Sequence, residues 1–250
     1  MLLLIDAGNT RIKWALQKTG QPLADWFAAG SVIHADIVTL AEQWQAHPIE
    51  RCLISNVAGD TIASQLTQLV SRVGVAASAL QWLASTHACA GIRNGYRQPR
   101  QLGCDRFAAL IGAHYLFPHQ PLLVVTCGTA TTIDALDARG NFIGGMILPG
   151  LATMARSLAV NTAGLPAVTE VKFSDLFADN TQEAIISGCM NAQVGAISRA
   201  LENCHDPAVL CVISGGAAKY IAPHLPMPYE QIDNLVLVGL AASAQEPASP

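Results

Sequence analysis

The sequence predicts an α/β fold built from two similar, duplicated domains, and three observations lead to this prediction. An apolar run at 2–5 ends in a turn that contains Gly8, and a second apolar run at 12–16 follows. The same arrangement of two apolar runs around a glycine turn recurs in mid-chain at 122–136. In both halves, strand-like runs alternate with segments of helical periodicity, as in α/β proteins. We therefore expect one such domain in each half of the chain.

The composition is that of a chain with a sizeable core. Hydrophobic residues make up 51% of the 250 positions and charged residues only 13%, which excludes general disorder. The formal net charge of −4 argues against nucleic acid as a partner. No apolar run reaches the roughly 18 residues that span a bilayer, and the N-terminus lacks the basic region of a signal peptide. The seven cysteines include no CxxC pair, so we expect them to be reduced thiols. Together with the missing membrane span and signal peptide, this predicts a cytoplasmic protein with no membrane partner.

In the first half, the apolar pattern changes between short runs and helical spacing. The elements expected after the first hairpin are a strand at 26–29, a helix at 37–45, a strand at 51–55 and a helix at 63–73. A further helix is expected to begin near Asp105, because a carboxylate in the first turn suits the positive end of a helix. These elements give the first half the alternation of an α/β domain.

The segment from Pro118 to Pro121 interrupts the pattern and marks the predicted boundary between the domains 1–117 and 118–250. The elements expected beyond the second hairpin are helices at 151–160 and 181–201, a buried strand at 208–214 and a closing helix at 235–242. The tail at 245–250 is polar and contains proline, so we expect it to be frayed.

Asp6 stands where an apolar strand meets the first glycine turn. A carboxylate among apolar groups needs a cation or hydrogen bonds to compensate its charge. One interpretation is a turn-forming aspartate that accepts local N–H groups. The other is Mg²⁺ binding, because this ion takes one or two carboxylates together with phosphates. Asn9, Thr10 and Lys13 nearby, with a similar turn in the second half, favour metal and phosphate binding. Two facing domains with phosphate turns would indicate phosphoryl transfer.

The segment 94–106 is rich in turn residues and leads into the predicted helix at Asp105. The simplest role of Asp105 is to cap that helix. A catalytic role would make it the base that takes a proton from an attacking hydroxyl. Arg106 would then bind an anion or stabilise the transferring charge, because a guanidinium binds carboxylate or phosphate with two parallel hydrogen bonds.

Several short motifs in one fixed order make the chain resemble a known family. The motifs are Asp6-x-Gly8-Asn9-Thr10, Tyr96-x-x-Pro99-x-x-Leu102-Gly103-x-Asp105-Arg106, Gly128-Thr129-Ala130-x-Thr132 with Asp134, Gly144-Gly145-x-Ile147-x-Pro149-Gly150, Asn161-Thr162-Ala163-x-Leu165-Pro166, Thr181 with Ser187-Gly188, and Ser214-Gly215-Gly216. This set resembles type III pantothenate kinases, a family that includes proteins first described as Bvg accessory factors. The resemblance runs from residue 3 to about residue 240.

The resemblance implies a duplicated actin-like ATPase fold of the acetate and sugar kinase/Hsp70/actin type, with two similar domains and a cleft between them. It implies ATP-dependent phosphorylation of pantothenate to 4'-phosphopantothenate, the first step of coenzyme A biosynthesis. The implied cofactors are Mg²⁺, placed at Asp6 through phosphate or water, and a monovalent cation, K⁺ or NH₄⁺. The implied assembly is a homodimer that binds ATP and pantothenate.

The resemblance also assigns roles to individual residues. Asp105 matches the catalytic base. The residues that match phosphate and ATP contacts are Asp6, Gly8, Asn9, Thr10 and Arg11 in the first motif, then Gly128, Thr129, Ala130 and Thr132, and finally Gly215 and Gly216 beside adenosine. The residues that match pantothenate contacts are Tyr96, Gly103, Asp105, Arg106 and Thr181.

One position departs from the family pattern. Many members begin the second phosphate motif with an aspartate that is associated with the monovalent cation, where this chain has Cys127. A neutral thiol is a poor ligand for a hard alkali cation. The need for K⁺ is therefore in doubt, unless carbonyl oxygens and water hold the ion.

Two other functions stay open at this point. The accessory-factor relatives and Cys127 suggest a regulatory or nucleotide-binding protein with weak catalysis. The joint presence of Asp6, Asp105 and Arg106 argues against this alternative. A related sugar or acetate kinase is the other alternative, and the Tyr96 to Arg106 motif argues against it.

Overall fold

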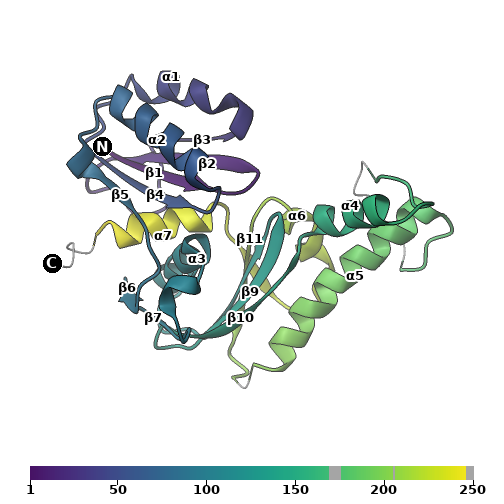
Figure 1. Cartoon of the computed structure of the whole chain (residues 1–250). Coiled ribbons are helices and arrows are strands. Elements are labelled where there is room, and N and C mark those ends of the chain that lie inside the picture. Colours follow the sequence, from purple (N-terminus) through teal and green to yellow (C-terminus); the bar gives the residue numbers. More distant parts are fainter. Residues whose placement is uncertain (169–175, 205, 246–250) are drawn as a thin grey trace. The chain divides into compact units, whose positions relative to one another are not determined.

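The computed structural model describes residues 1–168, 176–204 and 206–245 (Figure 1). The chain divides into two compact units. Unit 1 comprises Met1–Pro118, Gly140–Phe142 and Asn234–Pro250, and unit 2 comprises His119–Arg139 and Ile143–Asp233. The predicted domains 1–117 and 118–250 place one boundary near Pro118, but they do not assign Gly140–Phe142 and Asn234–Pro250 to unit 1. The tail beyond residue 245 lies outside the described residues.

Unit 1 contains a five-stranded sheet in the order β3-β2-β1-β4-β5. Its strands are β1 (Leu2–Ala7), β2 (Arg11–Gln17), β3 (Ala28–Ile33), β4 (Arg51–Asn56) and β5 (Leu80–Trp82). Strand β1 is antiparallel to β2 and parallel to β4, and β4 is parallel to β5. The two central strands are buried apolar runs, as expected for strands covered on both faces.

Unit 2 repeats this topology. Its strands are β8 (Leu122–Cys127), β9 (Ala130–Leu136), β11 (Leu210–Ser214), β12 (Tyr229–Gln231) and β10 (Asn141–Pro149), of which the first two residues belong to unit 1. The order β10-β9-β8-β11-β12 matches the order in unit 1 strand for strand. Strand β8 is antiparallel to β9 and parallel to β11, as β1 is to β2 and β4. The duplicated α/β fold is therefore confirmed at the level of topology.

The helices cover these sheets. In unit 1 they are α1 (Leu40–Trp44) after the 3-10 turn η1 (His34–Thr39), α2 (Asp60–Arg72), α3 (Cys104–Leu116) and α7 (Leu235–Ser243), with the 3-10 turns η2 (Ala77–Ala79) and η3 (Pro99–Gln101). In unit 2 they are α4 (Leu151–Asn161), α5 (Thr181–Glu202) and α6 (Ala218–Ile221), with the turn η4 (Ala222–His224). None of the helices within the described ranges is long and apolar enough to cross a membrane.

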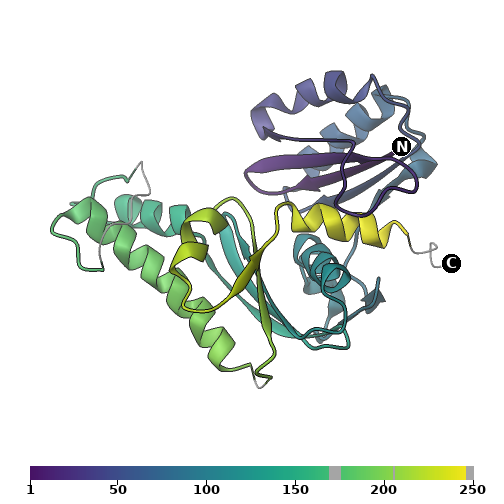
Figure 2. The same ribbon diagram turned by 180° about the vertical axis from the view of Figure 1, so that it is seen from behind.

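Helix α7 returns the C-terminal part of the chain to unit 1. Residues Leu235 to Ala242 are all buried, as expected for a helix that is apolar on every side. The helix packs against α3 inside unit 1, as the two views in Figures 1 and 2 show. The closing helix predicted at 235–242 is confirmed, but its partner could not be predicted from local periodicity.

Several predicted elements are displaced. The strand expected at 26–29 lies at β3, where alternating burial suits a strand next to β2. The segment expected as one helix at 37–45 is a 3-10 turn followed by the short α1. Helix α2 begins at Asp60 rather than at residue 63, because Gly59 has the positive φ of 89° that starts the turn. Strand β10 was missed because most of its side chains are exposed and its Gly144-Gly145 pair is typical of a turn.

Candidate functional site

The first candidate carboxylate lies at the end of β1, in a row of paired residues. Asp6 is opposite Lys13 on β2 and opposite Ser55 on β4. Strands β1 and β4 are parallel, so their carboxyl ends meet at the same edge of the sheet. Open α/β sheets bind their ligands at this edge. The structure thus brings Asp6 and Lys13 together, as the phosphate-site prediction requires.

The pKa of Asp6 is raised to about 7, mainly by burial; the charge of Lys13 lowers it, and the nearby Asp105 carboxylate contributes a smaller rise. The Asp105 carboxylate therefore acts on Asp6 at this edge of unit 1. A divalent cation would relieve their repulsion and favour the ionised form of Asp6. The described part of the chain holds no group of three or more His, Cys, Asp or Glu side chains suited to a metal. This donor set fits Mg²⁺ bound mainly by phosphates, with one protein carboxylate.

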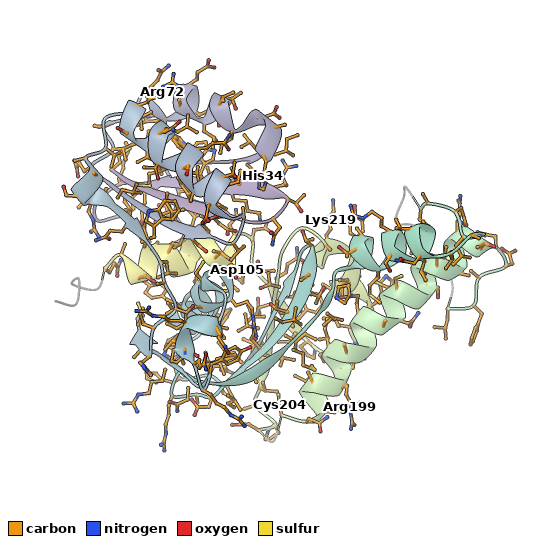
Figure 3. All side chains as sticks on the ribbon, in the orientation of Figure 1. His34, Arg72, Asp105, Arg199, Cys204 and Lys219 are labelled. Carbon is orange, nitrogen blue, oxygen red and sulfur yellow. The ribbon has the colours of Figure 1, made fainter. Side chains whose placement is uncertain are left out.

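The first glycine turn is exposed at its tip and braced at its base. Asn9, Thr10 and Arg11 are exposed, and the Gly8 N–H donates to the carbonyl oxygen of Arg11 at 3.1 Å. His34 donates from Nε2 to the carbonyl oxygen of Gly8 at 2.8 Å (Figure 3). The Arg11 Nε donates to the Ser31 hydroxyl at 2.8 Å. The turn is thus fixed from β3 and η1, and His34 is a supporting residue that the sequence did not reveal.

Asp105 lies in the first turn of α3, as predicted (Figure 3). Its Oδ1 accepts a hydrogen bond from the N–H of Arg106 at 2.8 Å. A Cβ atom on Gly103 would come within 2.6 Å of the same oxygen, so the glycine leaves room for the carboxylate. Burial raises the pKa of Asp105, and the hydrogen bond and charge of Arg106 oppose this shift. The carboxylate is half-buried and close enough to Asp6 to raise its pKa.

The start of α3 is attached to the end of β4 through Cys104. Its sulfur accepts a hydrogen bond from the Ser55 hydroxyl at 3.3 Å and donates to the carbonyl oxygen of Asn56 at 3.4 Å. Ser55 is also the strand partner of Asp6. This connection explains how a helix residue distant in sequence comes next to Asp6. Sequence analysis missed Ser55 and Cys104, because only the pairing of β1 with β4 places them here.

Arg106 and Tyr96 form the remaining part of the unit 1 site. The Arg106 Nη1 donates to the Tyr96 hydroxyl at 2.9 Å, and the guanidinium carbon lies 5.6 Å from the centre of the Tyr96 ring. Arg106 is only 6% exposed. Four of the five predicted pantothenate residues, Tyr96, Gly103, Asp105 and Arg106, are thus gathered around the start of α3.

The second glycine turn, between β8 and β9, resembles the first. The Gly128 N–H donates to the carbonyl oxygen of Ala130 at 2.9 Å. The Thr129 carbonyl accepts hydrogen bonds from the Gly150 N–H at 2.9 Å and from the Thr153 hydroxyl at 2.8 Å. Gly128, Thr129 and Ala130 are exposed, as a phosphate turn requires. Gly150 and Thr153 are supporting residues at the start of α4.

Two further predicted residues lie beside this turn. Gly215 has a φ of 99°, and a Cβ atom there would clash with the backbone of Cys127. The Cys127 carbonyl also accepts a hydrogen bond from the Ala217 N–H at 3.1 Å. The Gly215-Gly216 turn is therefore packed directly against the start of the second phosphate turn. Unlike the exposed residues 128–130, Thr132 has a buried hydroxyl with no partner among the described residues.

Thr181 is an exposed residue at the start of α5 in unit 2. The side-chain oxygen of Asn180 accepts a hydrogen bond from the Glu183 N–H at 3.0 Å and caps the helix there. The other four predicted pantothenate residues belong to unit 1. The contact of Thr181 with pantothenate stays a prediction.

The duplicated topology defines a two-domain α/β protein with an actin-like ATPase and sugar kinase fold. A candidate 2-dehydro-3-deoxygalactonokinase from Sinorhizobium meliloti superposes with a TM-score of 0.64, at 14% identity over 98% of each chain. The activator of 2-hydroxyisocaproyl-CoA dehydratase from Clostridium difficile, with bound ADPNP, superposes with a TM-score of 0.54, at 13% identity over 97% of this chain and 92% of the other.

Sequence relatives are more specific. The profile of the type III pantothenate kinase family matches residues 2–203. The type III pantothenate kinase of Herminiimonas arsenicoxydans is 53% identical over 96% of both chains, and that of Aromatoleum aromaticum is 47% identical over the whole of both chains. The chain therefore belongs to the type III pantothenate kinase family.

Proposed function

We propose that this chain transfers the γ-phosphoryl group of ATP to the primary hydroxyl of pantothenate. The product would be 4'-phosphopantothenate, in the first step of coenzyme A biosynthesis. The observation that carries the proposal is the half-buried carboxylate of Asp105, held at the start of α3 beside Arg106 and close to Asp6. The relatives of the same name support pantothenate as the acceptor, and the solved neighbour with ADPNP supports a nucleotide donor.

In this mechanism Asp105 aligns the pantothenate hydroxyl and accepts its proton. Burial raises the pKa of Asp105, which makes it a stronger base than an exposed aspartate. The hydrogen bond and the charge of Arg106 oppose this rise in pKa and favour the ionised form of the carboxylate, which is the form that accepts a proton. Arg106 would also bind the pantothenate carboxylate or stabilise the transferring phosphoryl group. Positioning and electrostatics supply most of the acceleration in phosphoryl transfer.

Asp6 would hold Mg²⁺ directly or through water, with Lys13 opposite it on β2. The bound ion would supply positive charge that offsets the phosphates. The exposed residues of the two glycine turns offer N–H and hydroxyl donors to phosphate oxygens. These are Asn9, Thr10 and Arg11 in unit 1 and Gly128, Thr129 and Ala130 in unit 2.

Cys127 does not fit a monovalent cation. Its side chain is fully buried in a core cluster with residues such as Val125, Ile133 and Ile213. Burial raises the pKa of its thiol to about 12, so the sulfur is neutral at physiological pH. A neutral sulfur among apolar groups is not a ligand for K⁺ or NH₄⁺. We therefore propose that no monovalent cation is held by this side chain.

The first test is pantothenate-dependent ADP release with Mg·ATP, with K⁺, NH₄⁺ or Na⁺ as the only monovalent cation. We expect activity that changes less than about twofold among the three cations, because Cys127 offers no charged ligand. A strong preference for K⁺ or NH₄⁺ would show that other oxygen atoms bind the ion. No ADP release with any of them, from folded protein that binds ATP, would favour the regulatory function. Release with a sugar or acetate instead would favour a related kinase.

Assembly as a homodimer is also part of the proposal. Three large apolar side chains of unit 2 support it, since Ile143, Ile147 and Val160 are 69%, 64% and 74% exposed. Large apolar side chains that are exposed in one chain become buried when a second copy covers them. The cytoplasmic location stays a prediction.

The raised pKa of Asp6 makes the stability of the protein depend on pH. Its ordinary value of 3.8 rises to about 7 on folding, so between these values the folded chain binds a proton that the unfolded chain does not. The stability that depends on this proton is present at pH below about 4 and is lost as pH rises through about 7. We expect Asp6→Asn, which stays neutral, to raise Tm relative to the parent at pH 8 but much less at pH 5.

Thermal unfolding of both proteins at the two pH values measures this effect. The matched control is Asp25→Asn, a change at an exposed carboxylate of the same unit. An equal Tm difference at pH 5 and pH 8 for Asp6→Asn would contradict the expectation. The same variant should lose Mg·ATP-dependent activity, because an amide cannot replace a carboxylate toward Mg²⁺.

A further inference from the structure

A phenylalanine from the second half of the chain lies beside the substrate-site arginine. The ring of Phe142 is 1% exposed, and its centre lies 5.3 Å from the centre of the Tyr96 ring with the planes tilted by 36°. The guanidinium carbon of Arg106 lies 5.9 Å from the Phe142 ring centre and 5.6 Å from that of Tyr96. Together, Tyr96 and Phe142 form an aromatic clamp on Arg106. No motif in the sequence pointed to Phe142.

The backbone of unit 1 fixes this clamp. Phe142 is the second residue of β10 and pairs in parallel with Asn94 of β7 (Ile92–Asn94). The Asn94 side-chain oxygen accepts a hydrogen bond from the Tyr96 N–H at 3.1 Å, and its amide donates to the Pro99 carbonyl at 3.0 Å. Asn94 therefore connects the strand that carries Phe142 with the loop that carries Tyr96. The backbone segments that carry the two rings are thus linked to each other.

The clamp restricts a side chain that otherwise has many conformations. A buried guanidinium must be compensated by hydrogen bonds, charges or aromatic faces. Tyr96 supplies a hydrogen-bond acceptor and a ring, whereas Phe142 supplies a ring only. Phe142 has no polar atom with which to bind an anionic substrate. Any effect of this ring on the reaction must therefore pass through Arg106 or Tyr96.

We propose that Phe142 is a positioning residue that holds the Arg106 guanidinium in the orientation needed to act on pantothenate. The proposal rests on the function proposed above, in which Arg106 meets the substrate or the transferring group. It assigns part of the substrate site to the segment Gly140–Phe142, which belongs to unit 1 although it follows the second hairpin.

A double-mutant cycle tests the proposal through Phe142→Leu, Arg106→Gln and the variant with both changes. We expect Phe142→Leu to lower kcat/KM for pantothenate about 10-fold, the scale of a buried cation–π contact, with KM for ATP unchanged. In the Arg106→Gln background, the same change should lower kcat/KM by less than about twofold, because no guanidinium remains to be positioned. Equal factors in the two backgrounds, or no loss in the parent, would overturn the proposal.

A control variant and a readout that needs no turnover distinguish the positioning of Arg106 from a general loss of core packing. Leu66→Ala removes a fully buried apolar side chain of unit 1 on α2, away from α3, and it should lower Tm without changing kcat/KM for pantothenate. In 15N NMR, the Nε–H signal of Arg106, assigned by its loss in Arg106→Gln, should shift in Phe142→Leu. An unmoved signal would overturn the clamp. If the parent does not phosphorylate pantothenate, the proposed function fails, while this signal still decides whether Phe142 orients Arg106.

Discussion

Replacement of Asp105 by asparagine should lower kcat for pantothenate phosphorylation at least ~100-fold, the scale of lost general-base catalysis. Asparagine has nearly the same shape, and its side-chain oxygen can still accept the N–H of Arg106 that Asp105 Oδ1 accepts at 2.8 Å. The start of α3 should therefore keep its structure. The amide cannot take the proton of the attacking hydroxyl, so the loss should fall on turnover and leave ATP binding nearly intact.

This variant also separates the two roles that the sequence left open for Asp105. If the residue only stabilises the helix N-terminus, its replacement should behave like that of another acidic residue in a first turn. Asp60 provides this control, because it is exposed and begins α2. Asp60→Asn should leave kcat unchanged. Steady-state kinetics and calorimetric titration with ATP measure both variants, and near-normal turnover of Asp105→Asn would remove it from the role of base.

The two glycine turns of the candidate site could be predicted from the sequence, because each turn is local. Each glycine turn connects two adjacent strands, so the apolar runs around Gly8 and Gly128 were sufficient to place it. The position of Asp105 in the first turn of α3 followed from equally local signals. Such signals depend on neighbours within a few residues, so they can be recognised in a single amino-acid sequence.

The rest of the site depends on pairings between distant segments. Ser55 lies beside Asp6 because β4 pairs with β1, and it meets Cys104 because α3 packs on β4. Phe142 lies beside Tyr96 because β10 pairs with β7. Strand β7 has three residues and β10 is mostly exposed, so neither has the alternating pattern that identifies a strand. The sequence therefore indicated the chemistry of the site but not the residues that hold it in place.

The packing of α7 on α3 is a long-range contact of the same kind, and it leads to the largest expected effect on stability. The two helices meet through glycines. A Cβ atom on Gly239 would clash with the backbone oxygen of Ala108 and lie 3.0 Å from its Cα, and one on Gly112 would lie 2.9 Å from the backbone nitrogen of Gly239. Because backbone atoms cannot turn aside as a side chain can, the helices must separate to admit even one methyl group.

We therefore expect Gly239→Ala to lower the free energy of unfolding by about 3 kcal/mol, at the upper end of what overpacking costs. For a chain of this size, that loss corresponds to a Tm lower by roughly 6–12 °C. Calorimetry measures both quantities. The matched control is Gly195→Ala in α5, where a Cβ atom would meet nothing within 4 Å. There the alanine should raise stability by about 0.5–1 kcal/mol, because it favours the helix over the unfolded chain.

The activity of Gly239→Ala connects this contact to the site. Helix α3 carries Asp105 and Arg106 in its first turn, and α7 packs along the same helix within unit 1. If the helices separate, the Asp105 carboxylate moves away from Asp6. The kcat of Gly239→Ala should then be lower even at temperatures below its reduced Tm, where the variant is folded. Gly195→Ala should keep full activity. A destabilised Gly239→Ala with normal kcat would mean that Cys104, through its hydrogen bonds to Ser55 and Asn56, is sufficient to hold the start of α3 in place.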